Sequence, residues 1–237
     1  MENLASSNSL TRMAGNDEAS LFKTRKHGFG FFLDFARASK RALDVVMASA
    51  ALVFLLPLFL MLVGVLLVAQ GRPIFIRHSR VGRGGASFPC LKFRSMVTNS
   101  DVVLREYLAG NPSAREEWSE THKLKNDPRI TPLGRFLRKS SVDELPQLYN
   151  VIRGDMSLVG PRPIVRDEIV RYGAHIEEYL RVRPGLTGLW QVSGRSDISY
   201  QHRVVLDVRY VREWSLWRDF VIIFKTIPAL LRSSGSY

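Results

Sequence analysis

Residues 45–69, VVMASAALVFLLPLFLMLVGVLLVA, dominate the hydropathy of this chain, because the 25 residues include no charged side chain. At about 1.5 Å per helical residue, such a segment is long enough to cross the hydrocarbon core of a bilayer. It is too long for the apolar region of a secretory signal peptide and lacks a small-residue cleavage site. Pro57 lies in its middle and removes a backbone donor, so we expect the helix to kink or break there.

Basic residues flank this segment on both sides, six before it and six after it: Lys23, Arg25, Lys26, Arg37, Lys40 and Arg41, then Arg72, Arg77, Arg80, Arg83, Lys92 and Arg94. The positive-inside rule therefore favours neither orientation. We predict a re-entrant hairpin that enters one leaflet, turns at Leu56-Pro57 and returns, leaving both basic flanks on the cytoplasmic face. A kinked single span and a buried soluble helix are the alternatives.

The composition excludes several classes of protein. In 237 residues, 34 Lys+Arg stand against 22 Asp+Glu, a net charge of +12, and 46% of residues are hydrophobic. That hydrophobic content excludes a wholly disordered basic tail. The charge indicates an anionic partner, either nucleic acid or a membrane surface with phosphorylated substrates. The single cysteine, Cys90, excludes an intramolecular disulfide framework and a cysteine zinc cluster.

The rest of the chain predicts an α+β domain of mainly short helices with a small β-hairpin. Residues 73–81 and 87–97 alternate apolar and polar side chains around the glycine cluster 82–85, which favours a hairpin turn over a phosphate loop. Helices are expected near 101–109, 113–124, 132–139, 144–152, 164–181 and 199–212. The amphipathic segment 217–232 predicts a final helix that either lies in the membrane interface or packs on the core.

These patterns divide the chain into three parts. Residues 1–20 lack periodicity and are expected to form a disordered tail. Residues 21–71 form the membrane-associated re-entrant region, and residues 72–237 form a cytosolic domain. No internal repeat is present.

Two adjacent carboxylates, Asp143 and Glu144, stand directly before a predicted helix. Ser141 with Glu144 has the spacing of a capping box, or Asp143 is itself the N-cap, which would place Pro146 at a tolerated position. An aspartate at a helix N-terminus is held ionised by the helix dipole, the state that a nucleophile or metal ligand needs. Capping alone would also explain the pair.

Two further blocks combine rigid turns with polar side chains. In Gly160-Pro161-Arg162-Pro163, the prolines restrict the backbone around Arg162. An arginine held in this way is suited to bidentate binding of a phosphate. The alternative is that the segment is only a stiff connector. Residues 183–195, RPGLTGLWQVSGR, form a glycine-rich loop that could approach a nucleotide closely or simply turn the chain.

Together the blocks KFRSM (92–96), RKSSVDELPQLYNVIRGDMSLVGPRP (138–163) and RPGLTGLWQVSGR, after KRALDVV (40–46), resemble the bacterial polyprenyl-phosphate sugar-1-phosphate transferases, the small monotopic phosphoglycosyl transferases. The resemblance covers residues 38–232. Within this family, NPSAREEW, HKLKNDPRIT and FKTIPALLRSSGSY are most similar to enzymes that start succinoglycan-type exopolysaccharide with galactose-1-phosphate.

The resemblance implies a reaction at the bacterial inner membrane, with the catalytic domain on its cytoplasmic face. A sugar-1-phosphate passes from a UDP-sugar to undecaprenyl phosphate through an aspartyl-phosphosugar intermediate, and UMP is released. Mg²⁺ is the implied cofactor, because it would neutralise the phosphates. Transfer of glucose-1-phosphate, or a non-enzymatic scaffold or nucleic-acid binder, remain the alternatives, although no recognisable nucleic-acid module is present and nucleic acid is the minor interpretation. The sequence makes no prediction of oligomeric state.

The resemblance also implies roles for individual residues. Asp143 is the expected nucleophile and Glu144 its metal-assisting partner, with Asp219 as a third acidic position and Asp207 as a weaker one. Phosphate binding and catalysis are expected to involve Arg138 and Arg162. Substrate contacts are expected from the motif positions Lys92, Arg94, Pro161, Pro163, Gly185, Thr187, Gln191 and Arg195.

Overall fold

A computed structural model describes residues 35–121, 124–194 and 198–231. The expected tail, residues 1–20, and the basic residues Lys23, Arg25 and Lys26 lie outside the described residues. The chain divides into two units, Met1–Leu43 and Asp44–Tyr237, and the site described below lies in the second. This second unit includes residues 44–71, which the sequence assigns to the membrane-associated region.

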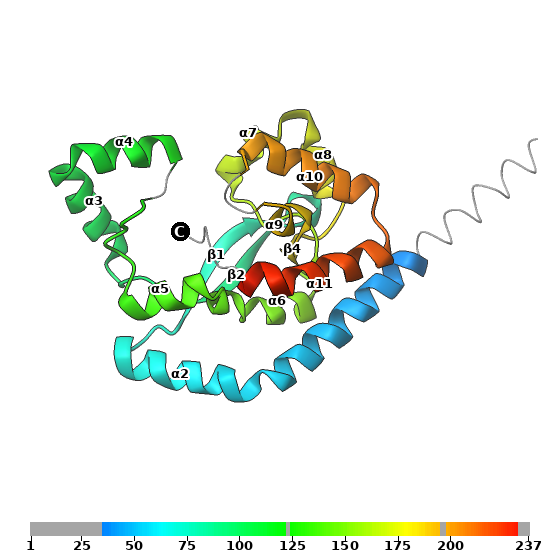
Figure 1. The fold of residues 1–237 in the computed structure, drawn as a ribbon, viewed down its shortest axis with the longest axis horizontal. Helices are drawn as coiled ribbons and strands as arrows, with labels where there is room; N and C mark the ends of the chain where they lie inside the picture. Colours follow the sequence, from blue (N-terminus) through cyan, green and yellow to red (C-terminus); the bar gives the residue numbers. More distant parts are fainter. Residues whose placement is uncertain (1–34, 122–123, 195–197, 232–237) are drawn as a thin grey trace, which may run out of the picture. The chain divides into compact units, whose positions relative to one another are not determined.

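The apolar segment forms two helices, Phe35–Phe54 and α2 (Leu56–Gln70), which are bent by 61° relative to each other (Figure 1). The break falls at Leu55, and Pro57 lies in the first turn of α2, where its missing N–H costs no helical hydrogen bond. The predicted break at the proline is therefore confirmed. Over the described ranges, no single helix is long and apolar enough to span a bilayer, whereas this bent pair together has the required length and composition.

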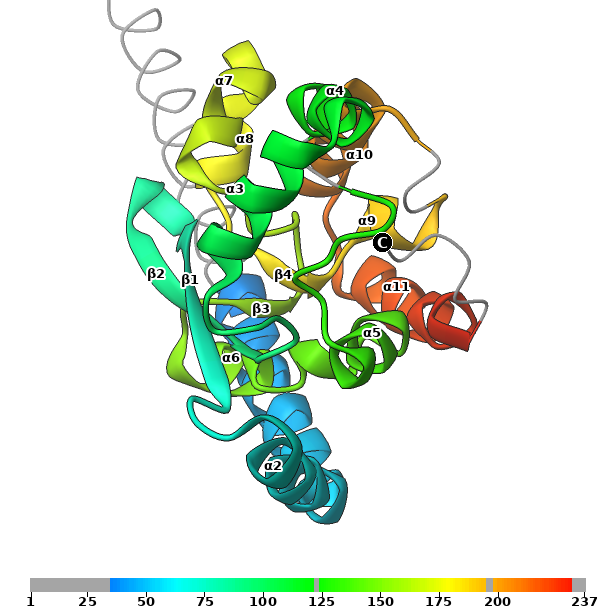
Figure 2. The same ribbon diagram turned by 90° about the vertical axis from the view of Figure 1, so that its left-hand side faces the viewer.

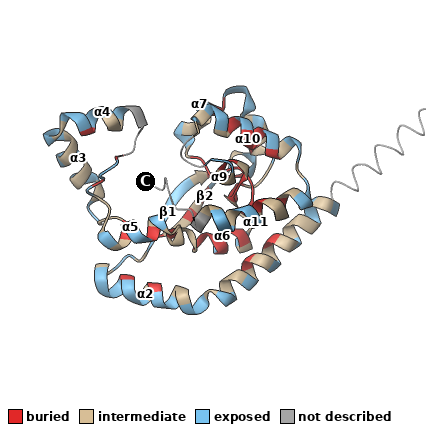
Figure 3. Ribbon diagram, in the orientation of Figure 1, coloured by how far each residue is buried: buried red, intermediate tan, exposed pale blue. Residues whose placement is uncertain are grey.

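One side of α2 packs on the protein and the other faces outward. Leu62 and Leu66 are buried with Phe93 and Leu137 in one hydrophobic cluster. Large apolar side chains on the remaining surface of the two helices are exposed: Val46, Val53, Phe54, Leu60, Met61 and Val68. Figure 3 shows exposed residues along α2 in pale blue. The alternative of a helix buried inside the protein is therefore wrong.

The predicted hairpin is confirmed. Strands β1 (Phe75–Val81) and β2 (Ser87–Phe93) pair antiparallel, with Phe75 opposite Phe93 and Val81 opposite Ser87. The glycine cluster forms the turn, and Gly84 and Gly85 adopt positive φ angles of 69° and 82° that favour glycine. The second strand ends at Phe93, four residues earlier than expected. Arg94 N still donates to Ile74 O beside the first strand, but beyond it the backbone pairs elsewhere, because Ser95 O accepts from Thr131 N and Val97 N donates to Arg129 O.

Helices follow from residue 100 largely as predicted. They are α3 (Ser100–Gly110), α4 (Pro112–Thr121), α5 (Pro132–Lys139), α6 (Gln147–Arg153), α10 (Tyr200–Arg212) and α11 (Leu216–Leu231). The side chains of Thr131 and Ser199 cap α5 and α10 by accepting hydrogen bonds from Gly134 N and His202 N.

The prediction of a single helix over residues 164–181 is wrong. The segment is broken into the 3-10 turns Arg166–Glu168 and Gly173–His175 and the short helices α7 (Ile169–Tyr172) and α8 (Ile176–Leu180). Gly173 adopts φ 52° and ψ −130°, a conformation that interrupts the helical hydrogen bonds.

A second, parallel strand pair was not predicted. Strand β3 (Ser157–Val159) pairs with β4 (Gly185–Thr187), and the short helix α9 (Leu189–Val192) follows. The two segments approach so closely that a Cβ atom on Gly185 would lie 2.1 Å from the backbone nitrogen of Gly160. This contact brings the Pro-Arg-Pro turn and the glycine-rich block together.

The core lies between these elements. Helix α6 packs on β2 (Figure 2), where Leu148, Val151 and Met156 are buried with Cys90. Helix α10 packs on α8 and α9, and α11 packs on α9, β3 and β4. The fold is thus α+β and mainly helical, as predicted.

Helix α11 packs on the core through one face, while its other face is exposed. Asp219 and Ile222 are buried on its packed face, whereas Trp217, Phe224 and Ile227 are 76%, 70% and 56% exposed. The apolar stripe that the sequence displays is therefore largely the outward face of the helix.

Candidate active site

The Asp143-Glu144 pair lies in a short 3-10 turn, Val142–Glu144, between α5 and α6. Both sequence-based capping schemes are wrong. Ser141 adopts a left-handed conformation with φ 57° and its side chain caps nothing, while α6 begins only after Pro146. A non-glycine residue in this region is strained by about 1–2 kcal/mol. The chain therefore accepts a local cost immediately before the two carboxylates.

Lys92 of β2 lies between the two carboxylates. Its Nζ is 2.6 Å from Glu144 Oε1 and 3.7 Å from Asp143 Oδ2. Asp143 is buried, with 6% of its surface exposed, and Glu144 is partly buried. Lys92 thus forms a tight ion pair with Glu144 and a looser one with Asp143.

The surroundings shift the two carboxyl pKa values in opposite directions. Burial raises the pKa of Asp143 above its usual value, although the charge of Lys92 acts to lower it. For Glu144, burial also acts to raise the pKa, but the charges of Lys92 and Arg162 outweigh it and the pKa lies below its usual value. Asp143 is therefore not the dipole-stabilised N-cap that we expected. It is a desolvated carboxyl group whose ionised form depends on neighbouring cations.

Two arginines supply further positive charge. Arg138 of α5 donates from Nε to Ser95 Oγ at 2.9 Å, and its charge acts to lower the pKa of Asp143 against the larger effect of burial. Arg162 is exposed between the buried Pro161 and Pro163, and its charge acts on both carboxylates. The structure therefore gathers Asp143, Glu144, Lys92, Arg138 and Arg162 in one neighbourhood, as the motifs implied.

A recess opens beside this group. Its walls come from the hairpin, α6, the Pro-Arg-Pro turn and β4: Arg80, Cys90, Lys92, Glu144, Gln147, Arg162, Pro163, Gly185 and Leu186. Most of its charged side chains are cationic, so it suits an anion. Burial raises the pKa of Cys90 to about 11, which keeps the thiol protonated and unreactive at neutral pH.

Arg80 and Gln147 line this recess without having been predicted. The hairpin register places Arg80 opposite Phe88, so Arg80, Cys90 and Lys92 share one face of the sheet. The two-residue alternation of the sequence shows which residues of each strand share a face, but only the pairing register places Arg80 on the same face as Cys90 and Lys92. Gln147 is the first residue of α6 and is 3% exposed.

Other expected site residues have structural partners elsewhere. Arg94 is buried and donates to the backbone oxygens of Gln70 and Gly71, so it fixes the end of α2. Thr187 exchanges a hydrogen bond of 2.8 Å with Thr226 of α11, and Gln191 Nε2 donates to Leu186 O at 3.4 Å. Arg195 lies outside the described residues.

The two further acidic positions also lie apart from the pair. Asp219 accepts hydrogen bonds from Tyr210 (2.8 Å) and Trp214 (3.1 Å). Asp207 accepts one from Tyr172 at 2.8 Å. Within the described ranges, no three acidic, histidine or cysteine side chains gather as a metal site, so Asp219 is not brought to Asp143 and Glu144.

Comparison with known proteins identifies the family of this chain. The family model for bacterial sugar transferases matches residues 35–233. The exopolysaccharide production protein ExoY of Sinorhizobium fredii is 56% identical over 199 residues, which cover 84% of this chain and 88% of that protein. The undecaprenyl-phosphate galactose phosphotransferase of Salmonella typhimurium is 54% identical over 202 residues, 85% of this chain and 42% of that longer protein.

A third relative carries a different sugar in its name. The UDP-glucose:undecaprenyl-phosphate glucose-1-phosphate transferase of Caulobacter vibrioides is 40% identical over 206 residues, which cover 84% of this chain and 72% of that protein. The match to the family model and the extent of these identities agree with the motifs quoted above. This chain belongs to the bacterial sugar transferase family.

Proposed function

We propose that this enzyme transfers galactose-1-phosphate from UDP-galactose to undecaprenyl phosphate, as the first membrane step of exopolysaccharide synthesis. The observation that carries the proposal is the buried Asp143 beside Glu144 and Lys92, at the edge of a cationic recess. Such a group suits nucleophilic attack on a phosphodiester anion, because the cations offset the negative charges that must approach each other.

The reaction proceeds in two displacements at the same phosphorus atom. A carboxylate oxygen of Asp143 attacks the sugar-proximal phosphorus, and the bond to the bridging oxygen breaks with its electron pair leaving on UMP. A phosphate oxygen of undecaprenyl phosphate then attacks the acyl phosphate and releases the Asp143 carboxylate. The bond between the sugar carbon and its oxygen stays intact throughout, so the anomeric configuration is retained.

The donor set fits Mg²⁺ held jointly by protein and substrate. Magnesium in nucleotide sites is commonly bound by one or two carboxylates together with substrate phosphates and water. Glu144, with its lowered pKa, and Asp143 would hold the ion, which when bound neutralises phosphate charge. Asp219 would have to give up two hydrogen bonds to join them and is left out of the proposal.

The choice of galactose is supported by the relatives. The named galactose phosphotransferase is 54% identical to this chain, whereas the named glucose-1-phosphate transferase is 40% identical. Glucose-1-phosphate transfer is the second candidate, because the two sugars differ at a single hydroxyl group.

We further propose that the enzyme rests on the cytoplasmic face of the inner membrane. The exposed apolar side chains of the bent helix pair and of α11 would enter the lipid, as would suit a site that meets a lipid-linked phosphate and a cytosolic nucleotide sugar. The basic residues Arg72 and Arg77, which follow α2 in the sequence, would meet anionic headgroups.

The test is a single-turnover measurement on the purified full chain in nanodiscs. With UDP-galactose and Mg²⁺ but no carrier, we expect UMP in an amount equal to the enzyme and a covalent sugar phosphate on the protein. UDP-glucose should give a smaller or slower burst. Asp143→Asn should abolish both the burst and the adduct, and UMP release by this variant at the normal rate would refute the nucleophile assignment.

A further inference from the structure

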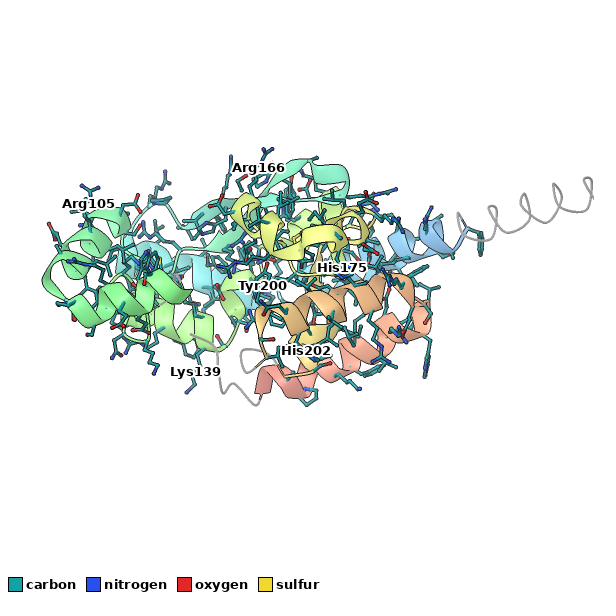
Figure 4. All side chains as sticks on the ribbon, turned by 90° about the horizontal axis from the view of Figure 1, so that it is seen from above. Arg105, Lys139, Arg166, His175, Tyr200 and His202 are labelled. Carbon is teal, nitrogen blue, oxygen red and sulfur yellow. The ribbon has the colours of Figure 1, made fainter. Side chains whose placement is uncertain are left out.

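Trp190, Arg162 and Arg203 form a cluster in which two cations lie against one indole ring. Trp190 of α9 is 6% exposed. The guanidinium carbon of Arg203 is 4.7 Å from the centre of its ring, and that of Arg162 is 5.8 Å away. Arg203 comes from the first turn of α10, next to the residues Tyr200 and His202 labelled in Figure 4. We refer to these three residues as the two-arginine cluster.

The cluster concentrates positive charge at a cost. Each guanidinium gains from the face of the indole ring, but the two like charges repel. Burial and the charge of Arg162 both act to lower the pKa of Arg203. A dianionic or trianionic ligand between them would remove this repulsion.

Arg162 connects the cluster to the catalytic carboxylates. It lines the recess with Lys92 and Glu144, and its charge acts on Asp143. Arg203 shares the Trp190 ring with Arg162. A ligand that reaches from Asp143 along Arg162 to Arg203 therefore needs at least two linked anionic groups.

On the basis of the proposed function, we propose that Arg162 and Arg203 together bind the diphosphate of the nucleotide-sugar donor. Arg162 binds the phosphate that Asp143 attacks, and Arg203 binds the phosphate that leaves with UMP. Guanidinium groups present paired donors that match two phosphate oxygens. When the bond to the bridging oxygen breaks, its electron pair moves onto the UMP phosphate, and Arg203 stabilises that charge.

The binding test compares Arg203→Gln with Arg209→Gln in the full chain in nanodiscs with Mg²⁺. Arg209 is a matched control, because it lies on the same helix and pairs with Glu213 on the exposed surface at 3.2 Å. We expect Arg203→Gln to weaken binding of both UDP and UMP by about 10- to 100-fold, the usual effect of losing a charged hydrogen bond. Arg203→Lys should recover part of the affinity, and melting temperatures check that the variants are folded.

The kinetic test separates donor from carrier. In Arg203→Gln, UMP formation before carrier addition should slow by a similar factor, while transfer from preformed adduct to undecaprenyl phosphate should keep its rate. Equal UMP affinity in the Arg203→Gln and Arg209→Gln variants would overturn the proposal, as would a slowed carrier step with an unchanged donor step. If the wild-type enzyme binds UMP but releases no UMP from any UDP-sugar, the proposed function is refuted. The comparison of UMP affinities still tests whether Arg203 binds the UMP phosphate.

Discussion

Replacing Asp207 with asparagine should make the stability of the enzyme much less dependent on pH. Asp207 is 2% exposed, and its Oδ2 accepts a hydrogen bond from Tyr172 at 2.8 Å. Its Oδ1 has no hydrogen-bond partner among the described residues. Burial raises the pKa of this carboxyl group to about 7, although Tyr172 and Arg162 act to lower it. The ionised form is therefore unfavourable in the folded state.

The magnitude follows from linkage. A rise from the ordinary value of 3.8 to about 7 is roughly 3 pKa units, or about 4 kcal/mol at about 1.4 kcal/mol per unit. Because the folded-state pKa is the higher one, this stability is fully present below the unfolded-state pKa. It is lost as pH rises through about 7. Asparagine carries no charge at any pH in this range. Its buried amide NH₂ group would lack a hydrogen-bond partner, however, which lowers the free energy of unfolding by about 2 kcal/mol. The variant should thus gain about 2 kcal/mol at pH 8.

The assay is thermal unfolding of wild type and Asp207→Asn from pH 5 to 8. At pH 8 the variant should melt about 4–8 °C higher, since 1 kcal/mol corresponds to about 2–4 °C in a domain of this size. The two curves should cross between about pH 5 and 6, below which wild type is the more stable. Other carboxylates affect both proteins equally, so the difference isolates Asp207. A difference in melting temperature that is constant across this range would refute the reasoning.

Three further predictions concern the site and its supports. Lys92→Gln removes a cation that acts to lower the pKa of Asp143, so the pH below which the rate of UMP release falls should rise by about 1–3 units. An unchanged pH–rate profile would contradict this role of Lys92. Gly134→Ala should prevent folding, because its Cβ would lie 1.9 Å from Ser95 O, whereas Gly64→Ala, with nothing within 4 Å, should fold and melt no lower than wild type. Arg94→Gln should lower the melting temperature but leave the KM for UDP-galactose unchanged, since Arg94 holds Gln70 and Gly71; a raised KM would return it to the substrate site.

The parts of the fold that sequence could predict are those in which local chemistry agrees with the final structure. The hairpin has strand alternation and a glycine turn, and α10 begins at a serine cap, so both were predicted at nearly their observed positions. The prediction of one helix over 164–181 was wrong because the helical spacing of apolar residues continues through Gly173. Only the backbone conformation shows that this glycine breaks the helix. The β3–β4 pair joins segments of three residues each, too short for any periodicity to reveal.

The candidate site shows the same division. Asp143, Glu144, Arg138 and Arg162 could be named because family motifs mark them, but the motifs could not show that Lys92 lies between the carboxylates. Asp219 and Arg94 belong to motifs too, yet the structure gives them partners away from the recess. A motif marks residues that the fold needs, whether for packing or for chemistry. Arg203 belongs to none of the quoted motifs and emerges only when α10 packs beside Trp190.

The contrast between the two carboxylates explains why Asp143, and not Glu144, suits the role of nucleophile. Glu144 is held by Lys92 at 2.6 Å, and its pKa is lowered, so its oxygens are stabilised as a permanent anion and are correspondingly weak bases. Asp143 lies 3.7 Å from the same ammonium group, is more deeply buried, and has a raised pKa. A desolvated carboxylate with a raised pKa is the more basic partner, and two neighbouring groups whose pKa values are driven apart can take different roles in one reaction. In the proposed mechanism, Lys92 can then remain with Glu144 while Asp143 forms and later loses its bond to phosphorus, so the site would keep its ion pair through both displacements.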